Sequence, residues 1–134
     1  MGHVWTARID CQDPDVFDVT FRSGSRIFAP TWTIFKPMLA IRRSGRVATD
    51  EEWRTYGRAY LQQMALSHKL QPEAWEALLA RPRVVLTCYC TDPRRCHRTL
   101  LGLFLGRLGA TFNGELPDRD PYQEQLFDLA QDLT

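Results

Sequence analysis

One short apolar run, Val84–Cys88, restricts the fold of this chain more than any other segment. It is rich in β-branched residues and lacks polar alternation, which is typical of a strand buried on both faces of a sheet. After a polar loop, the segment Cys96–Leu108 is apolar on most sides and predicts a largely enclosed helix. A buried strand followed by an enclosed helix is characteristic of α/β domains. The chain is therefore expected to fold around a sheet covered by helices.

The remaining elements follow from alternation, helical spacing and capping signals. They are strands over residues 3–10, 16–21 and 111–112, and helices over residues 31–43, 49–67, 72–79 and 121–133. Thr49 and Glu52 have the spacing of a capping box, and Pro37 is expected to kink or divide its helix. This order predicts a single α/β domain over residues 1–134. Its sheet is expected to be mixed, mostly parallel and flanked by helices in three layers.

Charge and hydropathy limit where the protein is expected to be located and which macromolecules it is expected to bind. The net charge of +1 gives no global argument for binding to nucleic acid or to a membrane surface. No apolar stretch approaches the roughly 20 residues of a membrane span, and the first residues lack the pattern of a signal peptide. We therefore predict a cytoplasmic protein with reduced cysteines and no membrane contact. The pattern does not indicate an oligomeric state.

The loop between the buried strand and the enclosed helix is the segment best suited to chemistry. Cys88 ends the strand, and Cys96, His97 and Arg98 lie at the start of the helix. The first turn of a helix directs unpaired N–H groups and a positive dipole end at the space in front of it, so a thiol there should ionise more readily than free cysteine. We predict that Cys88 or Cys96 is the reactive thiol. His97 would orient that thiol or transfer protons.

Arginines in the same loop predict an anionic ligand. Arg98, together with Arg94 or Arg95, is expected to hold a phosphate, and Cys90 lies among the expected ligand-binding residues. Five residues separate Cys88 from Arg94, the spacing of a cysteine phosphatase loop. That alternative is disfavoured, because Asp92 and Pro93 replace the glycines that such a loop needs to cradle phosphate.

Two other interpretations of the cysteines remain open. Zinc could bind a set of four residues, which are Cys88, Cys90, Cys96 and His97. Zinc is not favoured, because structural sites usually combine two separated ligand clusters and adjacent residues rarely bend toward one ion. In the other interpretation the thiols only fill space and His97 binds a loop carbonyl. The sequence therefore specifies no cofactor.

The signature Cys-x-Cys-x5-Cys-His-Arg after a hydrophobic strand resembles the family called domain of unknown function 488, in its small phage and bacterial branch. The resemblance covers residues 4 to about 115, and its weaker matches are Phe17-Asp18-Val19-Thr20, Phe28-Ala29-Pro30, Trp32, Tyr56, Tyr60, Trp75, Leu86 and Gly114-Glu115. It implies a Rossmann-like domain whose signature falls on Cys88, Cys96, His97 and Arg98. Cys90 stands where many relatives carry an acidic residue, so a role of that carboxylate does not carry over. The resemblance brings no established reaction, but it favours a ligand site over accidental clustering.

Together these features predict a protein that binds a phosphate-bearing ligand, a nucleotide or a nucleic-acid end, at the cysteine loop. Whether cysteine-based catalysis follows is left open. The rivals are a zinc-stabilised interaction module and a nucleic-acid-binding accessory protein that uses the basic cluster Arg42–Arg46. The segment Ser23–Arg26 could touch a phosphate and Trp32 could stack on a base, although a turn and a core residue are the commoner outcomes.

Overall fold

A four-stranded parallel sheet forms the base of the domain. The computed structural model describes residues 2–116, and in it the strands are β1 (His3–Arg8), β2 (Val16–Asp18), β3 (Arg83–Cys88) and β4 (Thr111–Leu116). Their order is β2-β3-β1-β4, and every neighbouring pair is parallel. Because β3 and β1 are the central strands, the carboxyl end of β3 lies in the middle of one sheet edge.

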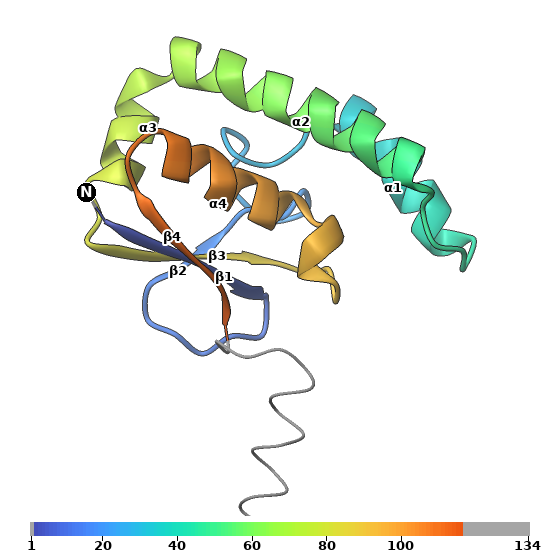
Figure 1. Ribbon diagram of the computed structural model, residues 1–134, viewed down its shortest axis with the longest axis horizontal. Helices are drawn as coiled ribbons and strands as arrows, with labels where there is room; N and C mark the ends of the chain where they lie inside the picture. The colour runs from blue at the N-terminus through green and yellow to red at the C-terminus, as the bar shows by residue number, and fades with distance from the viewer. Residues whose placement is uncertain (1, 117–134) are drawn as a thin grey trace, which may run out of the picture.

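The helices lie together on one side of this sheet (Figure 1). They are α1 (Trp32–Arg43), α2 (Asp50–Leu70), α3 (Pro72–Leu79) and α4 (His97–Arg107), with a short 3-10 turn, η1 (Pro93–Arg95), before α4. α4 packs on the sheet and α2 packs on α4, so sheet, α4 and α2 form three successive layers. The connection from β1 to β2 passes across the opposite side of the sheet without a helix.

The predicted fold class is confirmed as a small three-layer α/β domain. Within residues 2–116 the sheet contains no antiparallel strand, and helices cover one side rather than both. The helix predicted over residues 121–133 lies outside the described residues. None of the helices in the described part of the chain is both long and apolar enough to span a membrane.

The core lies between the sheet and α4. Val84 and Leu86 of β3 are fully buried and belong to one apolar cluster with Leu101 and Leu105 of α4. At Gly102 an added Cβ would lie 2.7 Å from the ring of Phe112 on β4, so the missing side chain permits close approach of helix and strand. This packing fixes the start of α4 against the end of β3.

Local signals explain most helix boundaries. Thr49 and Glu52 form the predicted capping box at the start of α2, with both side chains bonded to the other residue's backbone N–H. Gly109, at φ 112°, follows the end of α4 as predicted. Of the two expected effects of Pro37, a kink or a division of the helix, the division does not occur, because α1 is a single helix. The carbonyl that Pro37 leaves without an N–H donor belongs to Thr33, an exposed residue, where water can replace the bond.

Candidate functional site

Three thiols and one imidazole meet at the carboxyl end of β3. Cys88 is the last residue of β3, Cys96 is the N-cap of α4, and His97 is its first residue. The Cys88 sulfur lies 3.9 Å from the Cys90 sulfur and 3.8 Å from His97 Nε2. All four side chains are buried, and the three cysteines pack as a cluster of their own. The predicted handover from strand end to helix start is therefore confirmed.

His97 connects this cluster to the loop after β2. Its Nε2 lies 2.6 Å from the carbonyl oxygen of Val19, so Nε2 carries the proton and donates it. The other nitrogen, Nδ1, is 3.4 Å from the Tyr56 hydroxyl and accepts from it. Burial lowers the pKa of His97, which favours the neutral ring. The loop carbonyl is the partner that the space-filling interpretation of the cysteines expects.

The Cys88 thiol does not form a directed pair with this imidazole. Its sulfur is 3.8 Å from Nε2 and 4.0 Å from Nδ1, nearly equidistant from the two nitrogens. Nε2 already donates to Val19, and Nδ1 accepts from Tyr56. His97 therefore holds the loop after β2 against the thiols, and both of its ring nitrogens are bonded to partners other than Cys88.

Neighbouring thiols and cations set the ionisation of Cys88. Hydrogen bonds from the Cys90 and Cys96 thiols lower the pKa of Cys88 well below that of free cysteine, and the positive charge of Arg98 adds to this effect. The pKa of Cys90 is raised, chiefly because it donates to Cys88. Burial, followed by its hydrogen bonds to Cys88 and Cys90, raises the pKa of Cys96 as well. Burial of Cys96 thus opposes the ionisation that the helix start is expected to promote, and the two pKa directions favour Cys88 over Cys96 as the reactive thiol.

Arg98 is fully buried and its donors are taken by protein groups. Its Nε and one terminal nitrogen bind Glu115 at 3.0 and 2.6 Å. The other terminal nitrogen donates to the Cys90 carbonyl at 2.9 Å and lies 3.4 Å from the Cys96 sulfur. Thr6 donates a further hydrogen bond to Glu115 at 2.6 Å. Arg98 thus links β4 to the cysteine loop, and Glu115 extends this link to β1. Arg98 supplies positive charge beside the thiols, and each of its nitrogens is already bonded to a protein group.

A cavity of about 580 Å³ opens onto Cys88 and His97. Its wall combines arginines and aromatic rings with few other groups: Thr20, Phe21, Arg22, Arg26, Trp32, Phe35, Leu39, Arg42, Arg43, Cys88, Tyr89 and His97. We call it the arginine cavity. No carboxylate of residues 2–116 lines it, and none of its four arginines forms an ion pair within those residues. The positive charge of this wall is available to a bound anion.

The loop after β2 brings the first part of this wall into place. The Asp18 carboxylate accepts from the Thr20 N–H at 2.8 Å and from the Ser23 hydroxyl at 2.5 Å, which folds the chain back on itself. Gly24 permits the turn, because a Cβ there would lie 2.5 Å from the Thr20 nitrogen. The turn presents Phe21, Arg22 and Arg26 toward α1, whose residues complete the wall.

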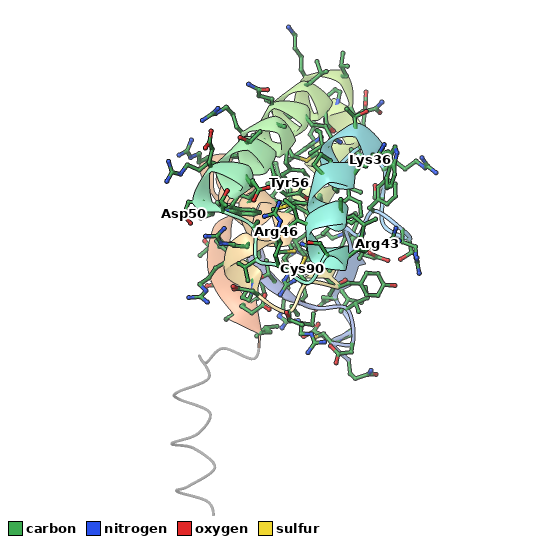
Figure 2. All side chains as sticks on the ribbon, turned by 90° about the vertical axis from the view of Figure 1, so that its right-hand side faces the viewer. Lys36, Arg43, Arg46, Asp50, Tyr56 and Cys90 are labelled. Atoms are coloured by element: carbon green, nitrogen blue, oxygen red, sulfur yellow. The ribbon has the colours of Figure 1, made fainter. Side chains whose placement is uncertain are left out.

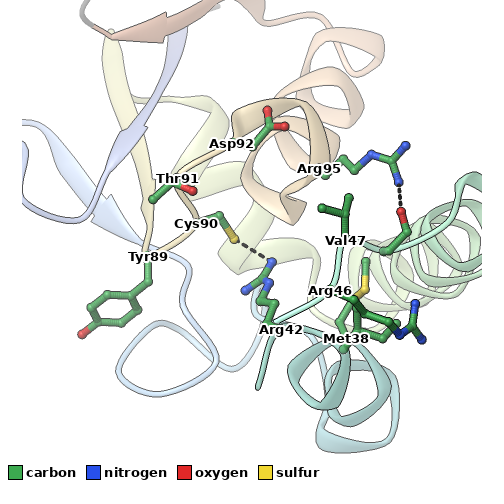
Figure 3. A pocket seen from close by; sticks show the side chains of 11 residues that line it. Met38, Arg42, Arg46, Val47, Tyr89, Cys90, Thr91, Asp92 and Arg95 are labelled. Atoms are coloured by element: carbon green, nitrogen blue, oxygen red, sulfur yellow. Dashed lines mark hydrogen bonds between the residues drawn. The ribbon is translucent and has the colours of Figure 1, made fainter. Parts of the chain in front are cut away.

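Arg42 separates the arginine cavity from a second one. Its terminal nitrogen is 2.9 Å from the Cys90 sulfur (Figure 3). On its other side is a cavity of about 440 Å³, which we call the neighbouring cavity, lined by Met38, Ile41, Arg42, Arg46, Val47, Ala48, Tyr89, Cys90, Thr91, Asp92 and Arg95. In Figure 2 Cys90 lies below the end of α1, with Arg43 and Arg46 on opposite sides of that end. Burial lowers the pKa of Arg42, but the combined contributions of Cys90, Cys96 and Tyr56 are larger, so the pKa is raised overall.

Two predicted ligand-binding arginines lie away from the thiols. The Arg94 side chain is 88% exposed and forms an ion pair with Asp92. Arg95 lies in the neighbouring cavity, where it donates to the Ala48 carbonyl at 2.9 Å and pairs with Asp50. The five-residue spacing from Cys88 to Arg94 therefore does not bring these two side chains together. Cys90, in contrast, lies within the cluster as predicted.

Sequence reasoning missed most of the arginine cavity as a unit. It considered Arg26, Trp32 and the Arg42–Arg46 cluster separately, and it passed over Phe21, Arg22, Phe35 and Tyr89. The one available signal is that both segments combine arginines with aromatic residues: Arg22 follows Phe21 in the loop after β2, and α1 begins at Trp32 and ends at Arg43. The structure places both segments at the strand end that carries Cys88.

The donor set at the same place could hold a metal ion. Donor atoms of Cys88, Cys96 and His97 all lie within 4.8 Å of one another, and the three residues are buried. Thiolate sulfur and imidazole nitrogen are the ligands that zinc prefers. The hydrogen bond from His97 Nε2 to Val19 would orient the ring for binding through Nδ1, as second-sphere partners of metal-bound histidines do.

Comparison with known proteins identifies the family but no solved relative. Neither the curated proteins nor the solved structures contain a match to this chain. A family model described as the active DUF488-N3 subclade matches residues 6–108. The match runs from the middle of β1 to the residue after α4, so it includes the cysteine cluster and every residue of the arginine cavity. Because this match covers more than half of the chain, the chain belongs to DUF488.

Proposed function

We propose that the protein binds a phosphate-bearing ligand in the arginine cavity and that Cys88 is the group that reacts with it. The single observation that carries this proposal is the cavity itself. Four arginines without carboxylate partners in residues 2–116 surround a space that opens onto the thiol of Cys88. Arginine binds phosphate through paired hydrogen bonds from its planar guanidinium, and such charge-assisted bonds are the strong ones.

The electrostatics of the thiol cluster suit a nucleophile. Arg42 contacts the Cys90 sulfur and Arg98 contacts the Cys96 sulfur, so positive charge lies next to the thiols that surround Cys88. This charge stabilises a thiolate at Cys88. As a thiolate, Cys88 would supply an electron pair to an electrophilic atom of the ligand. A bond from the sulfur to that atom would form as the bond from that atom to its leaving group breaks, and the leaving group would depart with the electron pair of the broken bond. A reducing compartment such as the cytoplasm would keep these free thiols available.

Alkylation by iodoacetamide, mapped by mass spectrometry of peptides, tests the proposal. Cys88 is expected to react at a pH well below the ~8.5 of a free thiol, and inorganic phosphate is expected to slow that reaction. Cys11, a half-buried cysteine outside the cluster, is the internal control and should be insensitive to phosphate. Arg43→Gln should weaken the protection by phosphate. The proposal fails if Cys88 reacts only at alkaline pH and phosphate gives no protection.

Zinc binding is the second candidate, supported by the proximity of the Cys88, Cys96 and His97 donor atoms. The ion would occupy the position of the nucleophile, so the two proposals exclude each other. We favour the thiolate because an arginine lies 2.9 Å from the Cys90 sulfur and would repel a cation. Elemental analysis of dialysed protein decides between them. About one zinc per chain, together with unreactive Cys88, would establish the metal site and overturn the first proposal.

A further inference from the structure

The mouth of the arginine cavity carries an aromatic surface that a small anion would not use. Phe21 is 38% exposed and Trp32 is 48% exposed, with their ring centroids 5.4 Å apart. Phe21 also stacks on Phe35, at 5.0 Å between centroids and 21° between ring planes. Scattered apolar side chains on a surface need no explanation, but an exposed cluster bordered by charge marks an interaction site.

The charge around this aromatic cluster is positive and comes from the same segments. Arg22 adjoins Phe21 in the loop after β2, and Arg43 lies on α1 with Trp32. Both arginines are exposed and form no ion pair within residues 2–116. Aromatic rings can stack on exposed bases, and the arginines between them can bind phosphates, so this surface suits a nucleic acid whose base faces are free. Single-stranded nucleic acid has this chemistry, whereas in a duplex the base faces are hidden by stacking.

We propose that the protein docks the end of a single-stranded nucleic acid on this surface, an inference that rests on the proposed binding of phosphate in the arginine cavity. One base stacks against Trp32 and Phe21. Arginines of the cavity bind the phosphates on either side of that base. The terminal nucleotide then lies in the cavity, above Cys88. The nucleic acid is recognised by stacking and charge, so little dependence on base sequence is expected.

Fluorescence anisotropy with an end-labelled oligothymidylate of about ten nucleotides tests the inference, because that length covers one typical single-strand site. Trp32→Ala is expected to weaken binding about tenfold or more through the loss of one stacked base. The matched control is Leu66→Ala, which removes another exposed apolar side chain, 56% exposed, from α2. This control should bind as the unaltered protein does.

Salt dependence separates the phosphate contacts from the stacking. Each phosphate contact to a single strand contributes about 0.7 to the slope of log affinity against log salt. Arg43→Gln should therefore make the slope shallower by about 0.7, whereas Arg58→Gln, an exposed arginine of α2 outside the cavity, should leave it unchanged. Oligonucleotides of DNA and RNA, used in parallel, identify which of the two strands binds more tightly.

Three results would overturn the inference: a duplex that binds as tightly as the single strand, thymidine monophosphate that binds as tightly as the oligomer, or Trp32→Ala that binds normally. Protection of Cys88 by inorganic phosphate is measured on the same samples. Protection without oligonucleotide binding removes only this inference. Loss of both removes the proposed function as well.

Discussion

The two cavities that share Arg42 have similar arginine content and different electrostatics. In the neighbouring cavity Arg46 forms two hydrogen bonds of 2.7 Å with Glu52, and Arg95 pairs with Asp50. In the arginine cavity no carboxylate of residues 2–116 forms an ion pair with Arg22, Arg26 or Arg43. Paired arginines cross-link the fold, and unpaired ones are available to a ligand. Loss of the first kind should therefore affect stability, and loss of the second kind binding.

The largest effect is expected at the most buried pair. Arg98→Met should lower the free energy of unfolding by about 3 kcal/mol, because Glu115 and the Cys90 carbonyl lose their donor. Urea denaturation measures this change. Arg94→Met is the control, since the pair that Arg94 forms with Asp92 is exposed and screened by water, so its loss should change the free energy of unfolding far less. Equal effects of the two substitutions would show that burial of the pair does not matter here.

A smaller effect is expected on binding at the wall between the cavities. Arg42→Gln should raise about tenfold the phosphate concentration that halves alkylation of Cys88, because one charge-assisted contact is lost. Arg46→Gln, on the opposite side of Arg42 and already paired with Glu52, should leave that concentration unchanged. If Arg46→Gln weakened protection as much as Arg42→Gln, the distinction between the cavities would be wrong.

The smallest effect concerns acid stability of the neighbouring cavity. The Arg46 guanidinium, with the backbone N–H of Thr49, lowers the pKa of Glu52 to about 2. A carboxyl with a lowered pKa in the folded state stabilises the fold above its unfolded pKa, near 4.5, and this contribution is lost as the pH falls toward 2. Glu52→Gln should therefore flatten the dependence of the thermal midpoint on pH between about 4.5 and 2. An unchanged slope would show that this exposed pair adds no pH-dependent stability.

The fold was largely predictable because its strongest signals are local. The apolar run of β3 and the enclosed helix α4 define the parallel sheet, and the capping box places the start of α2. Pro37 does not divide α1, because the cost of a helical proline depends on whether water can reach the freed carbonyl. The one-sided arrangement of the helices depends on the path of the β1–β2 connection, which has no sequence pattern of its own.

The candidate site was predictable where it is local and missed where it is not. Cys88, Cys96 and His97 are separated by fewer than ten residues, and their strand-to-helix handover places them together. The wall opposite them comes from the loop after β2 and from α1, far away in the sequence. Whether an arginine is paired depends on carboxylates that tertiary folding brings to it. For Arg46 and Arg95 those carboxylates are at the start of α2.

The bond from His97 to Val19 has a consequence for how the family can vary. Its acceptor is a main-chain oxygen, which every amino acid supplies. A change of side chain at position 19 therefore keeps the acceptor of this bond, whereas a shift of the backbone at that position would break the bond. A scan of single substitutions would show that position 97 requires histidine, but this bond would impose no matching requirement on the residue type at position 19. What matters at position 19 is where the backbone carbonyl lies, not which residue carries it. Insertions or deletions in the loop, which move the backbone, would reveal this requirement.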